Sequence, residues 1–362
     1  MIYLDYQATT PIAPEVRAAM APWMEEKFAN PHAPYRAGRE AAVAIDIART
    51  QVSEAMGRSD GTLAFTGSAT ESINWAIRGV IPEQRSHLVT LATEHAAVLD
   101  TISYCERRHD VTVVPVEPDG RVDLDRLRDA IRPETALVAA MLVNNEIGVV
   151  QPVAEIAGIA HEAGALMLCD AVQGLGRVPV PEGPDLVAVC AHKLHGPKMI
   201  GALWMAEGVA PEPLLYGGGQ EKGLRSGTLS PALCVGFGEA ASLARRRCEK
   251  DRAHVAALWE KGRDILSDWT LNGSTEDRYR GNLNLRRDGL DAARLLAENR
   301  DIAFSLGSAC ASGSGRPSHV LRALGLSDRE ARSSIRIGFG RYTDESDFVA
   351  ALEKLAESAR SQ

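Results

Sequence analysis

The sequence has 362 residues, of which 45% are hydrophobic and 24% are charged, a composition typical of globular proteins that excludes a disordered or fibrous chain. A formal net charge of −8 offers no basic surface to nucleic acid, so we expect no direct nucleic-acid contact. No apolar run approaches the roughly 20 residues that cross a bilayer, and the first residues lack the features of a secretory signal, which predicts a cytoplasmic protein without membrane contact.

Strand-like and helix-like segments alternate through the first two hundred residues. Helical apolar periodicity predicts helices at 41–57, 69–80, 123–131 and 153–164. Short apolar runs predict strands at 62–67, 87–92, 111–116, 136–143, 165–171 and 186–191. Because buried strands that alternate with helices are typical of parallel sheets, we expect an α/β fold with a mostly parallel sheet.

The pattern changes after about residue 250. The sequence there predicts helices at 252–267, 290–299, 317–325 and 344–360, and strands at 281–287 and 333–340. This order is α+β, which indicates a second, smaller domain. We place the large domain at 15–250 and the small domain at 1–14 together with 251–362.

Polar side chains follow five of the predicted strands. Ligand sites of parallel sheets lie at the carboxyl ends of the strands, so these side chains are expected to converge. In chain order they are Ser68 and Thr70, then His95, then Asn145, then Asp170 and Gln173, and finally His192 and Lys193.

Each of these groups has an ordinary alternative when taken alone. Ser68 and Thr70 are common helix caps, and a single histidine or aspartate after a strand is usually structural. Taken together, the “GSATES” segment predicts a phosphate cradle at a helix N-terminus. Lys193 closes an apolar strand, where partial burial favours the neutral, nucleophilic amine.

A phosphate cradle, a nucleophilic lysine, an aspartate and an imidazole together suggest pyridoxal phosphate (PLP). Other common sites are not indicated. No G-x-G-x-x-G motif follows the first strand, and the sequence contains neither a P-loop nor the G-x-S-x-G elbow of serine hydrolases.

Ordered motifs extend over nearly the whole chain. They include “YLDYQATTP” (3–11), “TGSATESINWAIRG” (66–79), “TEHAAVLD” (93–100), “VNNEIGVVQP” (143–152), “AHKLHGPKMIGALW” (191–204), “LRSGT” (224–228) and “GSACASGSGRPSHVLRALG” (307–325). This set resembles the cysteine desulfurases of the class V aminotransferase family, which have the PLP-dependent transferase fold of type I. The resemblance implies a seven-stranded, mostly parallel sheet in the large domain and PLP as the cofactor.

The resemblance also implies roles around the cofactor. Lys193 would hold PLP covalently and later move the α-proton, and Asp170 would pair with the pyridinium nitrogen. His95 would stack on the ring and transfer protons, and Gln173 would hydrogen-bond the ring hydroxyl oxygen. The remaining cofactor-binding positions are Ala69, Thr70, Asn145, His192, Thr228 and Cys190, the last standing where many relatives have a phosphate-binding serine.

Substrate and subunit contacts follow from the same resemblance. Asn145 and Arg336 would hold the carboxylate of L-cysteine, since a guanidinium binds a carboxylate through two hydrogen bonds. Asn30 would line the substrate pocket. Thr228 would reach the phosphate of the neighbouring subunit, which implies a homodimer with shared sites.

Cys310 lies among small residues in “SLGSACASGSGRPSH” (305–319), and none of the six cysteines forms a C-x-x-C pair, so we expect no resident metal. The resemblance implies that Cys310 is the nucleophile, taking sulfur as a persulfide while L-alanine leaves. The segment resembles the long, mobile loop of the nitrogen-fixation and housekeeping iron–sulfur group, whose flanking glycines let the thiol move. Cys310 is then also a candidate transient ligand of an iron–sulfur cluster.

Several alternatives stay open. A selenocysteine lyase or cysteine-sulfinate desulfinase would depend less on Cys310. A catalytically silent PLP-fold binding partner is a further alternative, supported only by Cys190. The sulfur acceptor is an iron–sulfur scaffold or a tRNA-thiolation carrier, and the sequence does not choose between them.

Overall fold

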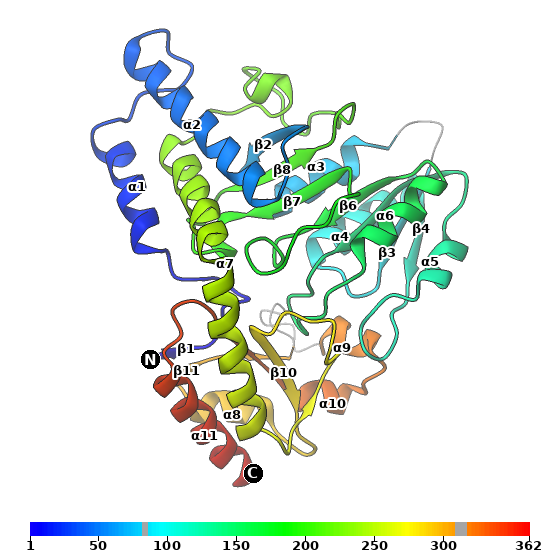
Figure 1. The fold of residues 1–362 in the computed structure, drawn as a ribbon. Coiled ribbons are helices and arrows are strands. Elements are labelled where there is room, and N and C mark those ends of the chain that lie inside the picture. Colours follow the sequence, from blue (N-terminus) through cyan, green and yellow to red (C-terminus); the bar gives the residue numbers. More distant parts are fainter. Residues whose placement is uncertain (82–85, 308–316) are drawn as a thin grey trace.

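The computed structural model describes residues 1–81, 86–307 and 317–362, which fold around one large sheet and two smaller ones (Figure 1). The strand order of the large sheet is β2-β8-β7-β6-β5-β3-β4, and β8 alone runs antiparallel to its neighbours. Its strands are β2 (Thr62–Thr66), β3 (His87–Leu91), β4 (Asp110–Val114), β5 (Thr135–Met141), β6 (Leu166–Asp170), β7 (Leu186–Cys190) and β8 (Gly201–Met205).

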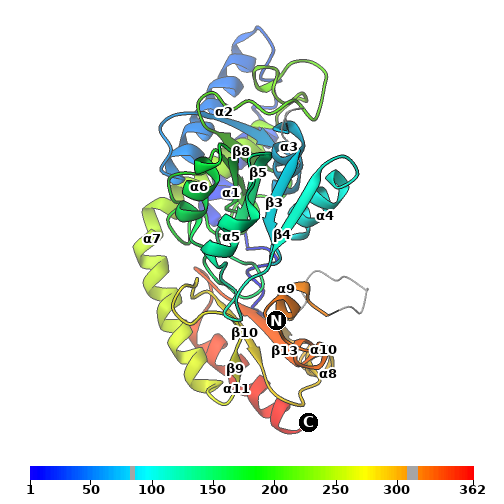
Figure 2. The ribbon, with the colours of Figure 1, turned by 90° about the vertical axis from the view of Figure 1, so that its right-hand side faces the viewer.

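Helices cover both faces of the large sheet because its strands carry apolar side chains on both faces (Figure 2). Val89 and Val138 belong to one core, whereas their neighbours Leu88 and Ala139 belong to the other. α3 (Ala69–Gly79) and α4 (Ala96–Cys105) cover the second of these cores. The first is covered by α1 (Pro14–Glu25), α2 (Arg36–Ala55), α5 (Leu124–Ala130), α6 (Val153–Glu162) and the N-terminal half of α7 (Pro231–Ile265).

The remaining part of the chain builds an antiparallel four-stranded sheet of order β12-β13-β10-β9. A parallel pair, β1 with β11, brings the N-terminus to this region. The elements are β1 (Ile2–Tyr3), β9 (Thr270–Leu271), β10 (Asn282–Arg286), β11 (Ile302–Ala303), β12 (Ser305–Leu306), β13 (Ser334–Gly338), α8 (Ala292–Glu298), α9 (His319–Ala323), α10 (Asp328–Arg332) and α11 (Glu345–Arg360).

The helix α7 connects the two parts of the molecule (Figure 1). Its first half buries Phe237 in the core of the large sheet, and its second half buries Leu258 and Trp259 in the core of the four-stranded sheet. The sequence predicts a helix over 252–267, whereas the observed helix begins at Pro231 and passes through residue 250 without a break.

An ion pair lies along the outer side of β2. Arg49 of α2 and Glu221 of η2 (Glu221–Gly223) approach to 2.7 Å. Arg49 donates a hydrogen bond to the Leu63 carbonyl at 2.6 Å, and Glu221 accepts one from the Phe65 amide at 2.8 Å. The pair thereby fixes the 214–228 segment to the sheet.

Apart from the much earlier start of α7, the strands and helices predicted from apolar periodicity are confirmed, with small shifts at their ends. β8 lies outside the predicted strands, since its sequence follows the polar “AHKLHGPK” segment and begins with a glycine. In the ranges that the structure describes, no helix is both long and apolar enough to span a membrane.

Candidate active site

The carboxyl ends of neighbouring strands bring the candidate side chains to one edge of the large sheet. β6 ends at Asp170 and pairs with β7, whose end leads directly into η1 (Ala191–Lys193). His95 follows β3, which lies two strands from β6. The charges of His95 and Lys193 both act on the Asp170 carboxyl, so the three groups lie within electrostatic reach of one another.

Asp170 places a carboxylate in a buried position. Its Oδ1 accepts a hydrogen bond from the Val172 amide at 2.9 Å. Burial raises the pKa of the Asp170 carboxyl, and the nearby His95 and Lys193 oppose that shift. A cationic group bound beside this carboxylate would stabilise its charge, so the position suits a protonated ring nitrogen.

Lys193 is held at the sheet edge by the N-terminal segment. Its Nζ donates to the carbonyls of Gln7 and Ala8, at 2.5 and 2.7 Å. This segment follows β1, so a part of the chain nearly two hundred residues away positions the amine. The carbonyls are hydrogen-bond acceptors that the ammonium form of the lysine can use.

His95 is the N-cap of α4, and its ring is oriented by the backbone. The Nδ1 atom accepts a hydrogen bond from the Ala97 amide at 3.0 Å. In the neutral imidazole, Nδ1 is therefore the acceptor and the proton resides on Nε2. The ring is only partly buried, which leaves it open to a bound molecule.

The N-terminus of α3 has the form of an anion cradle. Ser68 caps the helix by accepting from the Glu71 amide, which leaves the amides of Ala69 and Thr70 without hydrogen bonds in the described part of the chain. Gly201 packs so closely that a Cβ there would lie 2.5 Å from the Ser68 carbonyl carbon. Free amides and the positive end of the helix dipole favour a phosphate at this point.

Gln173 is buried close to Lys193, and both ends of its side-chain amide make hydrogen bonds. Its Nε2 donates to the Gln7 carbonyl at 2.9 Å, and its Oε1 accepts from Arg177. Arg177 also donates to the Lys193 carbonyl at 2.9 Å. Gln173 is thus tied to the same carbonyl that holds the Lys193 amine.

Cys190 and His192 flank the lysine and are both uncharged at neutral pH. Burial raises the pKa of the Cys190 thiol to about 12. Burial and the charge of Lys193 lower the pKa of His192 to about 4. The His192 Nδ1 lies 3.2 Å from the hydroxyl of Thr9. A neutral thiol is a weak hydrogen-bond donor, so the Cys190 side chain offers a phosphate less than a serine would.

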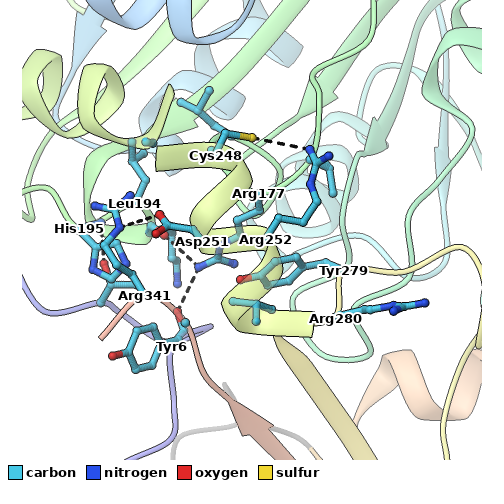
Figure 3. Close-up of a pocket in the computed structure, with 18 of the residues that line it drawn as sticks. Tyr6, Arg177, Leu194, His195, Cys248, Asp251, Arg252, Tyr279, Arg280 and Arg341 are labelled. Carbon is cyan, nitrogen blue, oxygen red and sulfur yellow. Dashed lines mark hydrogen bonds and ion pairs between the residues drawn. The ribbon is translucent and has the colours of Figure 1, made fainter. Parts of the chain in front are cut away.

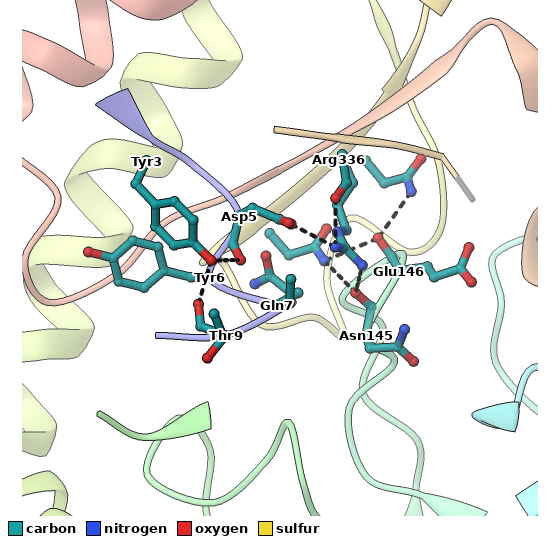
Figure 4. A network of polar contacts seen from close by, with 12 residues as sticks. Tyr3, Asp5, Tyr6, Gln7, Thr9, Asn145, Glu146 and Arg336 are labelled. Atoms are coloured by element: carbon teal, nitrogen blue, oxygen red, sulfur yellow. Dashed lines mark hydrogen bonds and ion pairs between the residues drawn. The ribbon is translucent and has the colours of Figure 1, made fainter. Parts of the chain in front are cut away.

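Arg336 is at the centre of a buried polar network (Figure 4). Its side chain is 1% exposed, and it is ion-paired with Asp5 at 2.7 Å. Its other hydrogen bonds are to the Asn145 carbonyl and the Ser305 hydroxyl, both at 3.1 Å. Its Nε atom has no partner in the described ranges of the chain. The network brings Asn145 and Arg336 together and leaves one buried donor for an anion.

Three of the predicted site residues are not brought into this constellation. Asn30 lies in the exposed connection between α1 and α2, where its side chain accepts from the His32 amide. Thr228 lies on an exposed segment just before α7. Cys310 is outside the described residues.

The structure also places four side chains beside the site that the pattern of strand ends did not identify. Asp5 and Gln7 belong to the “YLDYQATTP” motif, whose resemblance to a family was the only signal for them. Arg177 lies four residues after Gln173 in the same turn segment and contacts it. Glu94 precedes His95 and is fully buried, although acidic side chains rarely are.

The sequence matches the family described as aminotransferase class-V over residues 2–351. The chain belongs to the class V aminotransferase family. Within this family it is 42% identical, over 366 residues, to a protein named cysteine desulfurase IscS from Rickettsia bellii, in an alignment that covers 97% of this chain and 89% of the relative. The protein of the same name from Rickettsia conorii is 42% identical over 365 residues, with the same coverage of both chains.

Solved structures of related proteins share the fold. A NifS-like protein superposes with a TM-score of 0.93 at 31% identity, covering the whole of both chains. A NifS-like protein from Rickettsia africae has a TM-score of 0.91 at 28% identity, again over both whole chains. A structure described as SspA in complex with cysteine has a TM-score of 0.86 at 34% identity, covering 95% of this chain and 100% of that one.

Class V aminotransferases depend on PLP, and the side chains of this chain fit that cofactor. The buried carboxylate of Asp170 matches the ring nitrogen, and the amine of Lys193 matches the carbonyl carbon. The uncapped amides at the start of α3 match the phosphate. PLP is therefore the cofactor of this class V aminotransferase.

Proposed function

We propose that this class V aminotransferase is a cysteine desulfurase, which converts L-cysteine to L-alanine and leaves the sulfur as a persulfide on Cys310. The observation that carries the proposal is the placement of Lys193, Asp170 and His95 at strand ends of a chain that is 42% identical to named cysteine desulfurases. One similar structure is described in complex with cysteine, which supports the same substrate.

Bound PLP supplies an electron sink that weakens the bonds at Cα and Cβ of the substrate. Asp170 keeps a proton on the ring nitrogen through its buried carboxylate. The amides of Ala69 and Thr70 hold the phosphate at the positive end of α3. His192 is uncharged because its pKa is about 4, so it contributes a hydrogen bond without adding charge to the cradle.

Two side chains move protons in this proposal. Lys193, released by the carbonyls of Gln7 and Ala8, takes the α-proton with its neutral amine. His95 carries its ring proton on Nε2, because the backbone occupies Nδ1, and donates from there. Gln173 positions Lys193 through the Gln7 carbonyl, to which both side chains donate a hydrogen bond.

The substrate carboxylate is assigned to Arg336 and Asn145. The Nε of Arg336 is a buried donor that lacks a partner among the described residues, and an unsatisfied buried donor is stabilised by an incoming anion. Asp5 holds the guanidinium in place from the other side at 2.7 Å. Asn30 is proposed to line the mouth of the pocket.

Cys310 is proposed as the sulfur acceptor. Its thiolate attacks the substrate sulfur, so that an S–S bond forms as the Cβ–S bond breaks. The Cβ carbon keeps the electron pair of the broken bond and takes up a proton, so that the product is L-alanine. The glycines of the 305–319 segment are typical of the long loop type, in which the thiol visits both the cofactor and an acceptor.

We propose a homodimer in which the exposed Thr228 reaches the phosphate of the second subunit. The sulfur acceptor is proposed to be an iron–sulfur scaffold or a tRNA-thiolation carrier in the cytoplasm. The division into a large domain (15–250) and a small domain (1–14 and 251–362) is supported by the two hydrophobic cores on either side of the α7 midpoint.

The function is tested with three purified proteins: the wild type, Lys193→Ala and Cys310→Ser. Each is given L-cysteine and a reductant, and sulfide, L-alanine and the absorption spectrum are measured. We expect a yellow wild type that releases sulfide and alanine in equal amounts. Lys193→Ala should lose both the yellow colour and the products. Cys310→Ser should stay yellow and release no sulfide.

Other outcomes identify the alternatives. A wild type that binds no added PLP would contradict the proposal, and a yellow wild type without any product would point to a silent binding partner. If Cys310→Ser keeps its activity towards selenocysteine or cysteine sulfinate, the enzyme is a selenocysteine lyase or a desulfinase, because those reactions depend less on a protein thiol.

A further inference from the structure

A cavity of about 300 Å³ lies beside the middle of α7, between the large sheet and the smaller sheets (Figure 3). Its walls come from the N-terminal segment, the 175–178 turn, the end of η1, α7, and the residues around 279 and 341. Of the described residues assigned to the cofactor or the substrate, only Lys193 borders it. The cavity therefore adjoins the proposed active site at Lys193 and at Arg177, which contacts Gln173, but shares no other described residue assigned to the cofactor or the substrate.

The cavity wall carries uncompensated positive charge. Among the described residues that line it, Asp251 is the only carboxylate, and it is already ion-paired with Arg341 at 2.7 Å and Arg247 at 3.3 Å. Arg177 and Arg278 donate to carbonyl oxygens and have no carboxylate partner in the part of the chain that the structure describes. The arginines of the wall are Arg177, Arg252, Arg278, Arg280 and Arg341, of which Arg280 is ion-paired with Glu260 at 3.3 Å.

Two of these arginines have a buried N–H group without a hydrogen-bond partner in the described ranges, namely Arg278 Nε and Arg341 Nη1. Arg278 is 7% exposed, and its other nitrogens are engaged with the carbonyls of Ser274 and Ile147 at 2.7 and 2.8 Å. The Arg341 side chain is 3% exposed. Both guanidinium groups are thus held in buried positions at the wall of the cavity, and buried donors without partners cost free energy.

The pKa of Arg278 agrees with this shortage of negative charge. Burial lowers it, and the charge of Arg263 lowers it further. A bound anion beside the guanidinium would raise this pKa again. The Arg278 guanidinium lies over the ring of Trp259, at 4.6 Å from its centroid.

The rest of the wall is apolar or aromatic. Tyr279 presents its ring, over which the Arg177 guanidinium lies at 5.1 Å from the centroid. Leu175, Val178 and Val255 supply aliphatic surface. Such a wall suits an organic molecule better than a bare inorganic ion, because apolar surface is stabilised only by an apolar partner.

We propose that this cavity is a second ligand site, which binds a small organic carboxylate with an apolar or aromatic body. The arginines of its wall would supply positive charge for the carboxylate, and Tyr279 with the aliphatic side chains would contact the body of the molecule. The site adjoins the desulfurase site at Lys193 but does not depend on the desulfurase chemistry.

The probe for this site is benzoate, with benzamide as a neutral molecule of the same shape and inorganic phosphate as an anion without an apolar body. Binding to the PLP-loaded enzyme is measured by calorimetry. Cys248 lines the cavity and is partly buried, whereas the other described thiols are fully buried. Its alkylation by iodoacetamide, followed by mass spectrometry, reports occupancy directly.

We expect benzoate to bind and to slow Cys248 alkylation, and benzamide to do neither. Arg278→Met should weaken benzoate binding about tenfold, since it removes a buried positive charge from the wall of the cavity. The double variant Arg252→Gln and Arg280→Gln changes only exposed side chains, so it keeps the test valid if Arg278→Met fails to fold. That variant should weaken binding by about threefold or more.

Two controls locate the binding. Arg322→Gln removes an exposed arginine of α9 away from the cavity and should bind benzoate as the wild type does. Arg336→Lys alters the proposed substrate carboxylate site and should also leave benzoate binding intact. Loss of binding in Arg336→Lys with full binding in the cavity variants would overturn the proposal, and so would equal binding of benzamide or binding of phosphate alone.

Discussion

Glu94 shows how a single buried side chain makes the stability of this protein depend on pH. Its Oε1 accepts from the Met141 amide at 2.8 Å, while its Oε2 has no partner among the described residues. Burial raises the pKa of Glu94 well above its usual range, and the charge of Asp170 adds to the shift. The unfolded chain therefore releases this proton at a lower pH than the folded protein does.

The sign of the pH effect follows from that order of pKa values. Below the unfolded pKa both states are protonated, and stability is at its highest with respect to this group. As the pH rises towards the folded pKa, only the unfolded state ionises, so the wild type loses stability. We expect Glu94→Gln to lack this loss, and its stability relative to the wild type to increase from pH 5 to pH 8.

Denaturant unfolding at the two pH values measures this difference. Glu298→Gln is the matched control, because Glu298 is exposed and pairs with Arg294 on the surface. A relative stability of Glu94→Gln that stays constant between pH 5 and pH 8 would show that Glu94 does not titrate as inferred.

At the scale of single residues, the sequence predicted those site residues that are marked by their immediate neighbours in the chain. Lys193 and Asp170 stand at the ends of apolar runs, and position alone marked them as candidates. Asp5 had no such signal, because its partner Arg336 is 331 residues away in the chain. Its ion pair exists only once β13 has folded beside the N-terminal segment.

The helix α3 depends on how closely β8 packs against its first turn. A Cβ at Gly201 would lie 2.7 Å from the Ala69 nitrogen, which is closer than real contacts allow. We expect Gly201→Ala to displace the first turn, weaken PLP binding, and destabilise the protein by about 1–3 kcal/mol. Dialysis against fresh buffer followed by absorption measures cofactor retention, and thermal unfolding measures stability.

Gly158 provides the matched control for that substitution. It is exposed within α6, and a Cβ there meets nothing within 4 Å. Gly158→Ala should leave PLP binding unchanged and stabilise the protein by up to about 1 kcal/mol, since alanine favours a helix over glycine. Equal PLP retention in the two variants would contradict the role given to the α3 turn.

Helices and strands with one regular apolar pattern could be predicted from the sequence. A helix such as α7, whose two halves are buried in different cores, could not be predicted at its full length. The strands β3, β5 and β6 are largely apolar because both of their faces are buried. In α7 the apolar pattern stops between its two halves, where “ARRRCEK” (244–250) lies between the two cores. Local sequence cannot show that a polar stretch joins two buried halves of one helix.

The continuous helix α7 couples the unfolding of the two parts of the molecule. Ala253 is an exposed position between the buried halves of that helix, and proline there removes one helical hydrogen bond at a cost of about 3 kcal/mol. We expect the wild type to unfold in one calorimetric transition and Ala253→Pro in two. Only one of these should shift with added PLP, because a ligand stabilises only the part that binds it.

Ala253→Ser is the control for that experiment, since serine keeps the helical hydrogen bond and costs about 0.5 kcal/mol. It should unfold in a single transition. If Ala253→Pro also unfolds in one transition that shifts as a whole with PLP, the two cores are coupled through contacts other than α7, such as Tyr279, which packs against both.

The ion pair of Arg49 and Glu221 has a consequence for self-association. β2 is an outer strand, and its Leu63 carbonyl and Phe65 amide face away from β8. Free groups of this kind recruit strands from other molecules, which leads to edge-to-edge aggregation. Here a guanidinium and a carboxylate occupy them, in place of a neighbouring strand. The sheet therefore cannot be extended at β2 without breaking a salt bridge, and this edge of the sheet is protected against polymerisation.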